Sequence, residues 1–194
     1  MKYRDSGMPS EEMWDSFFSP TKILSKMEVD TEIDMLIDVG CGYGTFILPA
    51  SNIIKGKVIG IDVDNKMIEI CSDKIKNNQI HNIDLLNIDI SEEQSIDVLK
   101  KYNGRINYIS LFNILHCEDP IKLLGRIYKI LNDNGKVGII HWKYEKTPRG
   151  PSMDIRPKPE QIKEWATSVG FKVINQIDLP PYHYGIIFKK GDTK

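Results

Sequence analysis

The clearest pattern for chemistry is an acidic residue followed by three alternate glycines: Asp38, then Gly40, Gly42 and Gly44. Glycine adopts positive φ and has no Cβ, so a ligand can approach the backbone closely. The first N–H groups of a helix have no partner within the helix and favour a polar ligand. The apolar run from Met35, halted by these glycines, therefore predicts a buried strand that turns into a helix at a ligand site.

Acidic residues also end the next two predicted strands. Asp62 closes strand 57–62, 22 residues after Gly40. In nucleotide-binding α/β folds, an acid at this distance accepts hydrogen bonds from ribose hydroxyls. The alternative is a cap for the next helix, but Asp64 is better placed for that. Asp89 ends strand 83–90, and it is either a ligand-binding residue or a loop acid without a ligand.

Histidines supply the candidates for proton transfer. His116 follows strand 106–112 and is the best candidate for a general base, because histidine titrates near neutrality. The alternative is a structural histidine bonded to the backbone. His141 on strand 136–142 and His183 near the C-terminus are each predicted to be either buried or pocket-facing.

The segment D-V-G-C-G-Y-G, from Asp38 to Gly44, resembles motif I of the class I S-adenosylmethionine-dependent methyltransferases. A dinucleotide fingerprint requires G-x-G-x-x-G/A, whereas Thr45 occupies the last position here. Three later segments strengthen the resemblance: L-H-C-E-D-P at 115–120, L-N-D-N-G-K at 131–136 and I-I-H-W-K at 139–143. The first and the third, with the compact length of the chain, most resemble the methyltransferase type 11 group.

The resemblance implies S-adenosylmethionine as the cofactor. It implies that Asp38 lies near the cofactor's ammonium group, Asp62 at the ribose and Asp89 near the adenine amino group. The cofactor-binding residues expected on this basis are Asp38, Gly40, Cys41, Gly42, Gly44, Asp62, Val63, Asp89, Ile90 and Asn113.

Two further segments are expected to lie beside the acceptor. An N-terminal helical cap, residues 1–30, either covers the substrate or packs on the sheet edge or another subunit. The loop 143–158 contains three prolines and an excess of positive charge. Its Arg149 and Arg156 either neutralise an anionic acceptor, such as a carboxylate or phosphate, or balance surface acids. The substrate-pocket candidates are Trp14, Phe17, His141, Trp142, Arg149 and His183.

The elements that must position these residues alternate along the chain. Strands are predicted from Met35 and at 57–62, 83–90, 106–112, 136–142, 172–179 and 184–189. Helices between them predict an α/β fold with a doubly wound, mostly parallel, Rossmann-like sheet and ligands at the carboxyl edge of the strands. The resemblance implies seven strands with an antiparallel closing strand. We expect one domain over residues 1–194, with short N-terminal helices.

The composition excludes several classes of function. A net charge of −1 and the absence of an N-P-P-Y-like motif disfavour nucleic acid as substrate. No apolar run approaches 18 residues and no leader is evident, so we expect a cytoplasmic protein without a membrane partner. The three cysteines are widely spaced and predict neither disulfides nor a metal site. The sequence is compatible with both a monomer and a homodimer.

The expected function is methyl transfer to a small-molecule acceptor. The main alternative is a non-catalytic cofactor-binding or regulatory protein, in which Trp14, Phe17 or Trp142 would fill the acceptor space. Cys41 and Cys117 keep a metalloid acceptor open, although the usual cysteine set is missing. A nicotinamide-dependent oxidoreductase is disfavoured by Thr45 and the glycine spacing.

Overall fold

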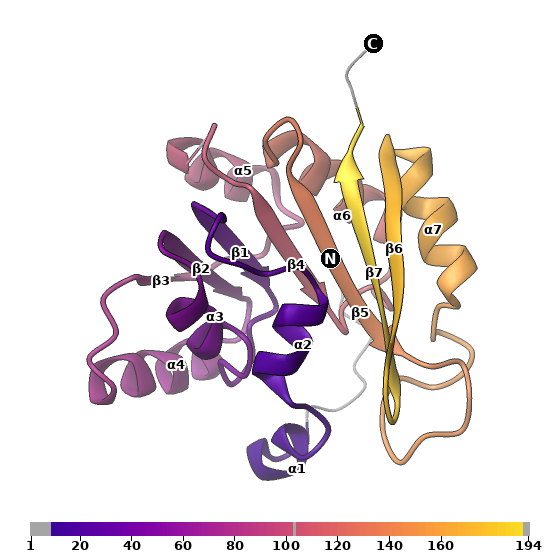
Figure 1. Ribbon diagram of the computed structural model, residues 1–194, viewed down its shortest axis with the longest axis horizontal. Coiled ribbons are helices and arrows are strands. Elements are labelled where there is room, and N and C mark those ends of the chain that lie inside the picture. Colours follow the sequence, from indigo (N-terminus) through magenta and orange to yellow (C-terminus); the bar gives the residue numbers. More distant parts are fainter. Residues whose placement is uncertain (1–8, 103, 192–194) are drawn as a thin grey trace.

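The computed structural model describes residues 9–102 and 104–191, so residues 1–8 of the expected N-terminal cap lie outside the described part. A seven-stranded sheet with strand order β3-β2-β1-β4-β5-β7-β6 forms the centre of the molecule (Figure 1). The strands are β1 (Met35–Val39), β2 (Lys57–Asp62), β3 (Ile83–Asn87), β4 (Tyr108–Phe112), β5 (Lys136–Trp142), β6 (Phe171–Leu179) and β7 (His183–Lys190).

Helices cover both faces of this sheet. They are α1 (Glu11–Asp15), α2 (Pro20–Lys26), α3 (Ile47–Ile53), α4 (Asn65–Asn77), α5 (Glu93–Leu99), α6 (Pro120–Ile130) and α7 (Pro159–Ser168), with a 3₁₀ turn η1 (Lys100–Tyr102). Apolar side chains of α2, α3 and α4 share one core, and those of α5, α6 and α7 share the core on the opposite face. The short helix α1 lies at the end of the sheet where β1 and β4 finish (Figure 1).

The strand directions confirm the predicted fold class. All pairs among β1 to β5 are parallel, whereas β7 pairs antiparallel with both β5 and β6. Thus β7 alone runs against the other strands of the sheet. Parallel strands joined by helices on both faces are a doubly wound α/β arrangement, and their carboxyl ends meet at one edge.

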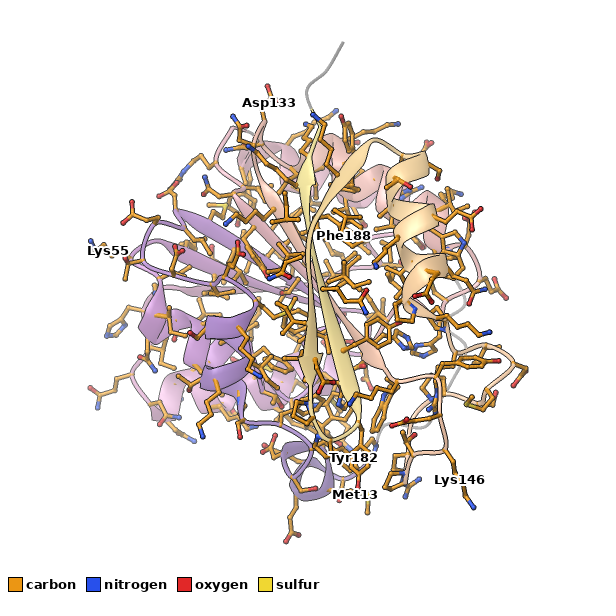
Figure 2. All side chains as sticks on the ribbon, turned by 45° about the vertical axis from the view of Figure 1, so that its right-hand side comes forward. Met13, Lys55, Asp133, Lys146, Tyr182 and Phe188 are labelled. Atoms are coloured by element: carbon orange, nitrogen blue, oxygen red, sulfur yellow. The ribbon has the colours of Figure 1, made fainter. Side chains whose placement is uncertain are left out.

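Hydrophobic burial holds the central strands in place. Every residue of β1 and β4 is buried, as expected for parallel strands covered on both faces. In Figure 2, Phe188 lies on β7 in the middle of the molecule, whereas Lys55, Asp133 and Lys146 project outward. No helix within the described ranges combines the length and apolar character that crossing a bilayer requires.

Some predicted boundaries were wrong. The third strand ends at Asn87 instead of Ile90, because the chain turns at Asp89, whose Oδ1 accepts a hydrogen bond from the Ser91 N–H at 2.7 Å. The fourth strand begins at Tyr108 instead of Ile106. These shifts leave the carboxyl ends of the strands, and the residues that follow them, at the same edge of the sheet.

Candidate functional site

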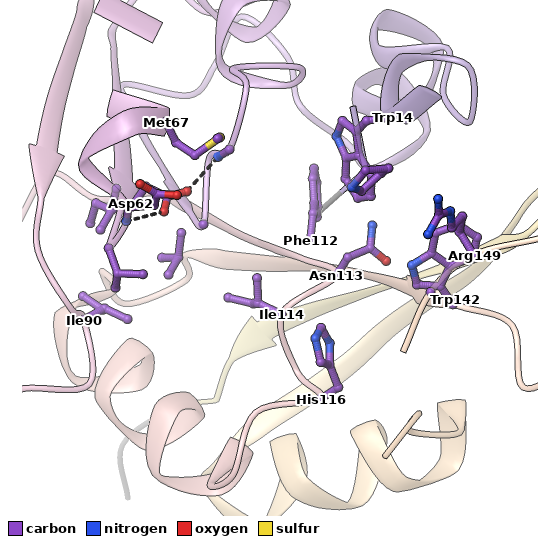
Figure 3. Close-up of a pocket in the computed structure, with 18 of the residues that line it drawn as sticks. Trp14, Asp62, Met67, Ile90, Phe112, Asn113, Ile114, His116, Trp142 and Arg149 are labelled. Atoms are coloured by element: carbon purple, nitrogen blue, oxygen red, sulfur yellow. Dashed lines mark hydrogen bonds between the residues drawn. The ribbon is translucent and has the colours of Figure 1, made fainter. Parts of the chain in front are cut away.

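A cavity of about 250 Å³ lies at the carboxyl edge of the parallel strands (Figure 3). One end is lined by Asp62 and Met67 with apolar residues at the end of β3, including Ile90. The opposite end is lined by Trp14 and Phe112, together with Trp142 and Arg149. Figure 3 shows Ile114 between these two groups and His116 beyond it. The cavity therefore has an acidic, apolar-walled end and an aromatic, cationic end.

The glycine loop after β1 forms one wall of the cavity. Gly40 and Gly42 line it, and Gly40, Gly42 and Gly44 have left-handed φ values of 76°, 51° and 85°. The N–H groups of Gly40 and Cys41 both donate to the Ile61 carbonyl, at 2.8 and 3.0 Å. These two loop N–H groups are therefore bonded to the end of β2. The glycines instead give the loop its shape and keep side chains out of the cavity.

Asp62 projects its carboxylate into the acidic end. Its Oδ2 accepts from the Gly42 N–H at 2.9 Å, and its Oδ1 accepts from the Asp64 N–H at 2.9 Å. A carboxylate has about four acceptor positions, so Asp62 retains capacity for hydroxyl donors. Met67 and Ile90 provide apolar surface beside it. This combination fits a nucleoside, with a ribose at the carboxylate and a base between apolar side chains.

Asp38 lies beneath the glycine loop and outside the cavity lining. It is 3% exposed and accepts a hydrogen bond from the Ser110 hydroxyl on β4. Burial raises the pKa of Asp38 to about 7; the Ser110 bond opposes this shift and the negative charge of Asp62 adds to it. This side chain thus joins β1 to β4 and is not among the residues that line the cavity.

Three other expected cofactor contacts also lie behind the cavity surface. Gly44 packs near Cys71 and Leu48, and Cys41 is buried in the same core. Asp89 does not line the cavity, because it accepts the Ser91 hydrogen bond, while its neighbours Ile88 and Ile90 do line it. Of the remaining expected contacts, Gly40, Gly42, Asp62, Val63, Ile90 and Asn113 line the cavity.

Two histidines, His116 and His141, lie next to each other near the ends of β4 and β5. His116 lines the cavity, and its ring centroid lies 5.5 Å from that of His141. His141 is fully buried, and burial, with a contribution from the charge of His116, holds its pKa well below the usual value. Burial also lowers the pKa of His183 to about 3, with added repulsion from Arg156 and Lys143.

Three of the substrate-pocket candidates, Phe17, His141 and His183, lie outside the cavity lining. His183 packs on the Trp142 ring at a centroid distance of 4.2 Å, and Phe17 packs on the same ring at 5.3 Å. Neither residue lines the cavity, and neither does His141. The side chains of Trp142 and His116 separate them from it. The substrate-pocket candidates Trp14, Trp142 and Arg149 do line the cavity, and their contact with a substrate stays a prediction.

Arg156 has a structural role that differs from the expected neutralisation of an anion. Its guanidinium is buried and donates to the carbonyls of Pro151, Lys143 and Glu145, at 2.7 to 3.0 Å. It also bonds to Thr147 Oγ1 at 2.9 Å. These bonds use the planar fork of the guanidinium to organise the loop 143–158. Arg156 thereby shapes the loop that carries Arg149.

A second cavity of about 460 Å³ lies between the loop 143–158 and helices α6 and α7. His116 lines both cavities. Within the described residues, no group of three or more His, Cys, Asp or Glu side chains is arranged to hold a metal. Cys41 and Cys117 belong to cores on opposite faces of the sheet, which removes the support for a metalloid acceptor held between them.

Sequence reasoning missed several apolar residues that line the cavity: Val39, Ile61, Met67, Ile88, Phe112 and Ile114. Most of them are neighbours of predicted polar residues at strand ends. Their position next to those polar residues was the feature of the sequence that could have identified them. Met67 borders the cavity because α4 begins soon after β2.

Comparisons with known proteins agree with this geometry. A family model described as a methyltransferase domain matches residues 36–135. The ribosomal protein L11 methyltransferase of Thermotoga maritima is 25% identical over 144 residues, which cover 71% of this chain and 50% of that protein. The demethylmenaquinone methyltransferase of Lactobacillus johnsonii is 25% identical over 135 residues, covering 66% and 51%. The chain thus spans about half the length of the curated relatives it matches.

Solved structures share the fold across nearly the whole chain. A SAM-dependent methyltransferase from Aquifex aeolicus superposes with a TM-score of 0.80 at 20% identity, covering 93% of each chain. A putative type 11 methyltransferase from Sulfolobus solfataricus gives a TM-score of 0.72 at 22% identity, covering 92% of this chain and 95% of the other.

Proposed function

The chain belongs to the methyltransferase-domain family and has S-adenosylmethionine as its cofactor, and on this premise we propose that it transfers a methyl group to a small-molecule acceptor. The cavity with two chemically different ends carries this proposal. Its acidic end suits a nucleoside, and its aromatic end offers a second, adjoining site for an acceptor.

At the acidic end, Asp62 accepts hydrogen bonds from the ribose hydroxyls. Val63, Met67 and Ile90 supply apolar surface for the adenine. Gly40 and Gly42 keep the loop free of side chains, while Asp38 is buried beneath it. Cys41 and Gly44 help to hold the glycine loop, and Asp89 helps to hold the turn after β3. None of the three lines the cavity.

The sulfonium supplies an already activated methyl group, so the protein must chiefly align the acceptor and exclude water. Residues 9–30 of the cap contribute Trp14, and the loop 143–158 contributes Arg149, to the aromatic end. His116 is the candidate base for an acceptor whose nucleophile carries a proton at working pH. Its position on the cavity wall supports this role.

The acceptor space is open, which favours catalysis over cofactor binding alone. Trp14 and Trp142 border the cavity without filling it, and Phe17 packs behind Trp142. The named relatives act on a ribosomal protein and on a demethylmenaquinone. A cavity bordered by α1 and the loop 143–158 supports a compact acceptor more than a folded protein.

Two measurements test the proposal. Calorimetric titration should give binding of S-adenosylmethionine and none of NAD. Incubation of the protein with methyl-labelled cofactor and a fractionated cell extract should then place label in the small-molecule fraction. Label found only in macromolecules would refute a small-molecule acceptor, and absence of cofactor binding would refute the enzyme assignment.

A further inference from the structure

We propose that Asn113 and Arg149 bind a carboxylate on the methyl acceptor, and that the acceptor is an aromatic or other planar carboxylic acid. This inference rests on the proposed methyl transfer and assigns the substrate class of the same site. Both side chains border the aromatic end of the cavity. Figure 3 shows the Asn113 amide directed toward the space between Trp14 and Trp142.

The side chain of Asn113 is a buried amide whose hydrogen-bonding capacity is unused. It is only 9% exposed, and neither its Oδ1 nor its Nδ2 has a hydrogen-bond partner among the described residues. Its backbone is held at a φ of 59°, and its N–H donates to the Ile140 carbonyl at 2.8 Å. A buried amide without partners is costly, so this side chain is best explained by a polar ligand.

Arg149 supplies the positive charge at the same end. Its side chain is exposed and borders the cavity, and it forms no ion pair with an acidic residue in the described part of the chain. Its backbone is held in the loop, because its carbonyl accepts hydrogen bonds from Thr147 and Arg156. The loop therefore presents an uncompensated guanidinium at the mouth of the acceptor site.

The surrounding side chains select the shape of the acceptor. Trp14, Phe112 and Trp142 provide aromatic walls, and Trp142 is 2% exposed and fixed by Phe17 and His183. Aromatic walls favour stacking or edge contacts with a planar ring. One guanidinium matches the two oxygens of one carboxylate, and an amide N–H₂ adds a further donor.

A carboxylate has two sources here, the acceptor and the amino-acid end of the cofactor. The experiment separates them by titrating acceptor probes into protein already saturated with S-adenosylhomocysteine. The probes are 4-hydroxybenzoate and its uncharged analogue 4-hydroxybenzamide. We expect the acid to bind at least tenfold more tightly than the amide.

Two variants and a control locate the effect. Arg149→Gln removes the charge, and Asn113→Gly removes the amide while glycine accepts the left-handed backbone. In each, the preference for the acid should fall at least fivefold. The S-adenosylhomocysteine affinity, which tests the alternative expectation that Asn113 contacts the cofactor, should change less than threefold. Lys146→Gln, which removes an exposed cation from the same loop, should retain the preference.

Equal binding of acid and amide, or binding of neither probe to the saturated protein, would overturn the inference. A large loss of S-adenosylhomocysteine affinity in Arg149→Gln or Asn113→Gly, with an unchanged preference for the acid, would assign that side chain to the cofactor and also overturn it. Failure of the wild-type protein to bind S-adenosylhomocysteine at all would instead contradict the proposed function.

Discussion

The backbone N–H of Gly42 donates a hydrogen bond to Oδ2 of Asp62 at 2.9 Å. This bond joins the loop after β1 to the end of β2. One carboxylate therefore shapes the glycine loop and faces the cavity, where it retains acceptor capacity for a ligand.

Asp62→Asn should weaken S-adenosylmethionine binding by about 1–3 kcal/mol, because an amide N–H₂ replaces one acceptor oxygen. Calorimetric titration measures this change. Asp73→Asn, which alters an exposed carboxylate on α4, should bind as the wild type does. Unchanged affinity in the Asp62 variant would argue against a ribose contact.

Asp38→Asn should alter how stability depends on pH. Because the pKa of Asp38 rises to about 7 on folding, the folded state retains a proton that the unfolded chain loses near pH 4. This group therefore makes the wild type less stable as pH rises from about 4 to 7.

Relative to the wild type, the Asp38→Asn variant should gain up to about 4 kcal/mol of unfolding free energy across that interval. Urea denaturation at pH 4.5, 6 and 8 measures the difference. Asp73→Asn, which removes an exposed carboxylate from α4, is the control. A difference between Asp38→Asn and the wild type that stays constant with pH would mean that the Asp38 carboxyl titrates normally.

Arg156→Lys should lower the free energy of unfolding by about 2–3 kcal/mol, because an ammonium cannot reproduce the fork that bonds to several loop carbonyls. Limited proteolysis should cleave the loop 143–158 faster. Lys146→Gln, in the same loop, should leave both measurements unchanged. Equal proteolysis of all three proteins would show that the loop does not depend on the guanidinium.

Lys74→Met should loosen α1 without unfolding the protein. The Lys74 ammonium pairs with the Glu11 carboxylate and donates to the Tyr43 carbonyl at 2.7 Å, which ties α1 to the glycine loop. Amide hydrogen exchange in residues 11–18 should become several-fold faster, while the global unfolding free energy changes by less than about 1 kcal/mol. Lys66→Met is the control on the same helix. Unaltered hydrogen exchange in the Lys74 variant would show that the Lys74 contacts do not hold α1 in place.

The sequence by itself determined the fold class and the edge of the sheet that carries the site. Alternating apolar strands and amphipathic helices are local signals, because burial repeats with the period of each element. Glycines at positions 40, 42 and 44, and an acid at the end of β2, are likewise local. They predicted which loops meet at the cavity.

Only the tertiary structure decided which side chains face that cavity. Asp38 turned inward to Ser110, Asp89 turned to Ser91, and His183 packed behind Trp142. Of the two arginines in the loop 143–158, Arg156 is buried and organises the loop, whereas Arg149 is exposed. The direction of each side chain depends on hydrogen-bond partners and packing from segments far away in sequence, which a local pattern does not contain.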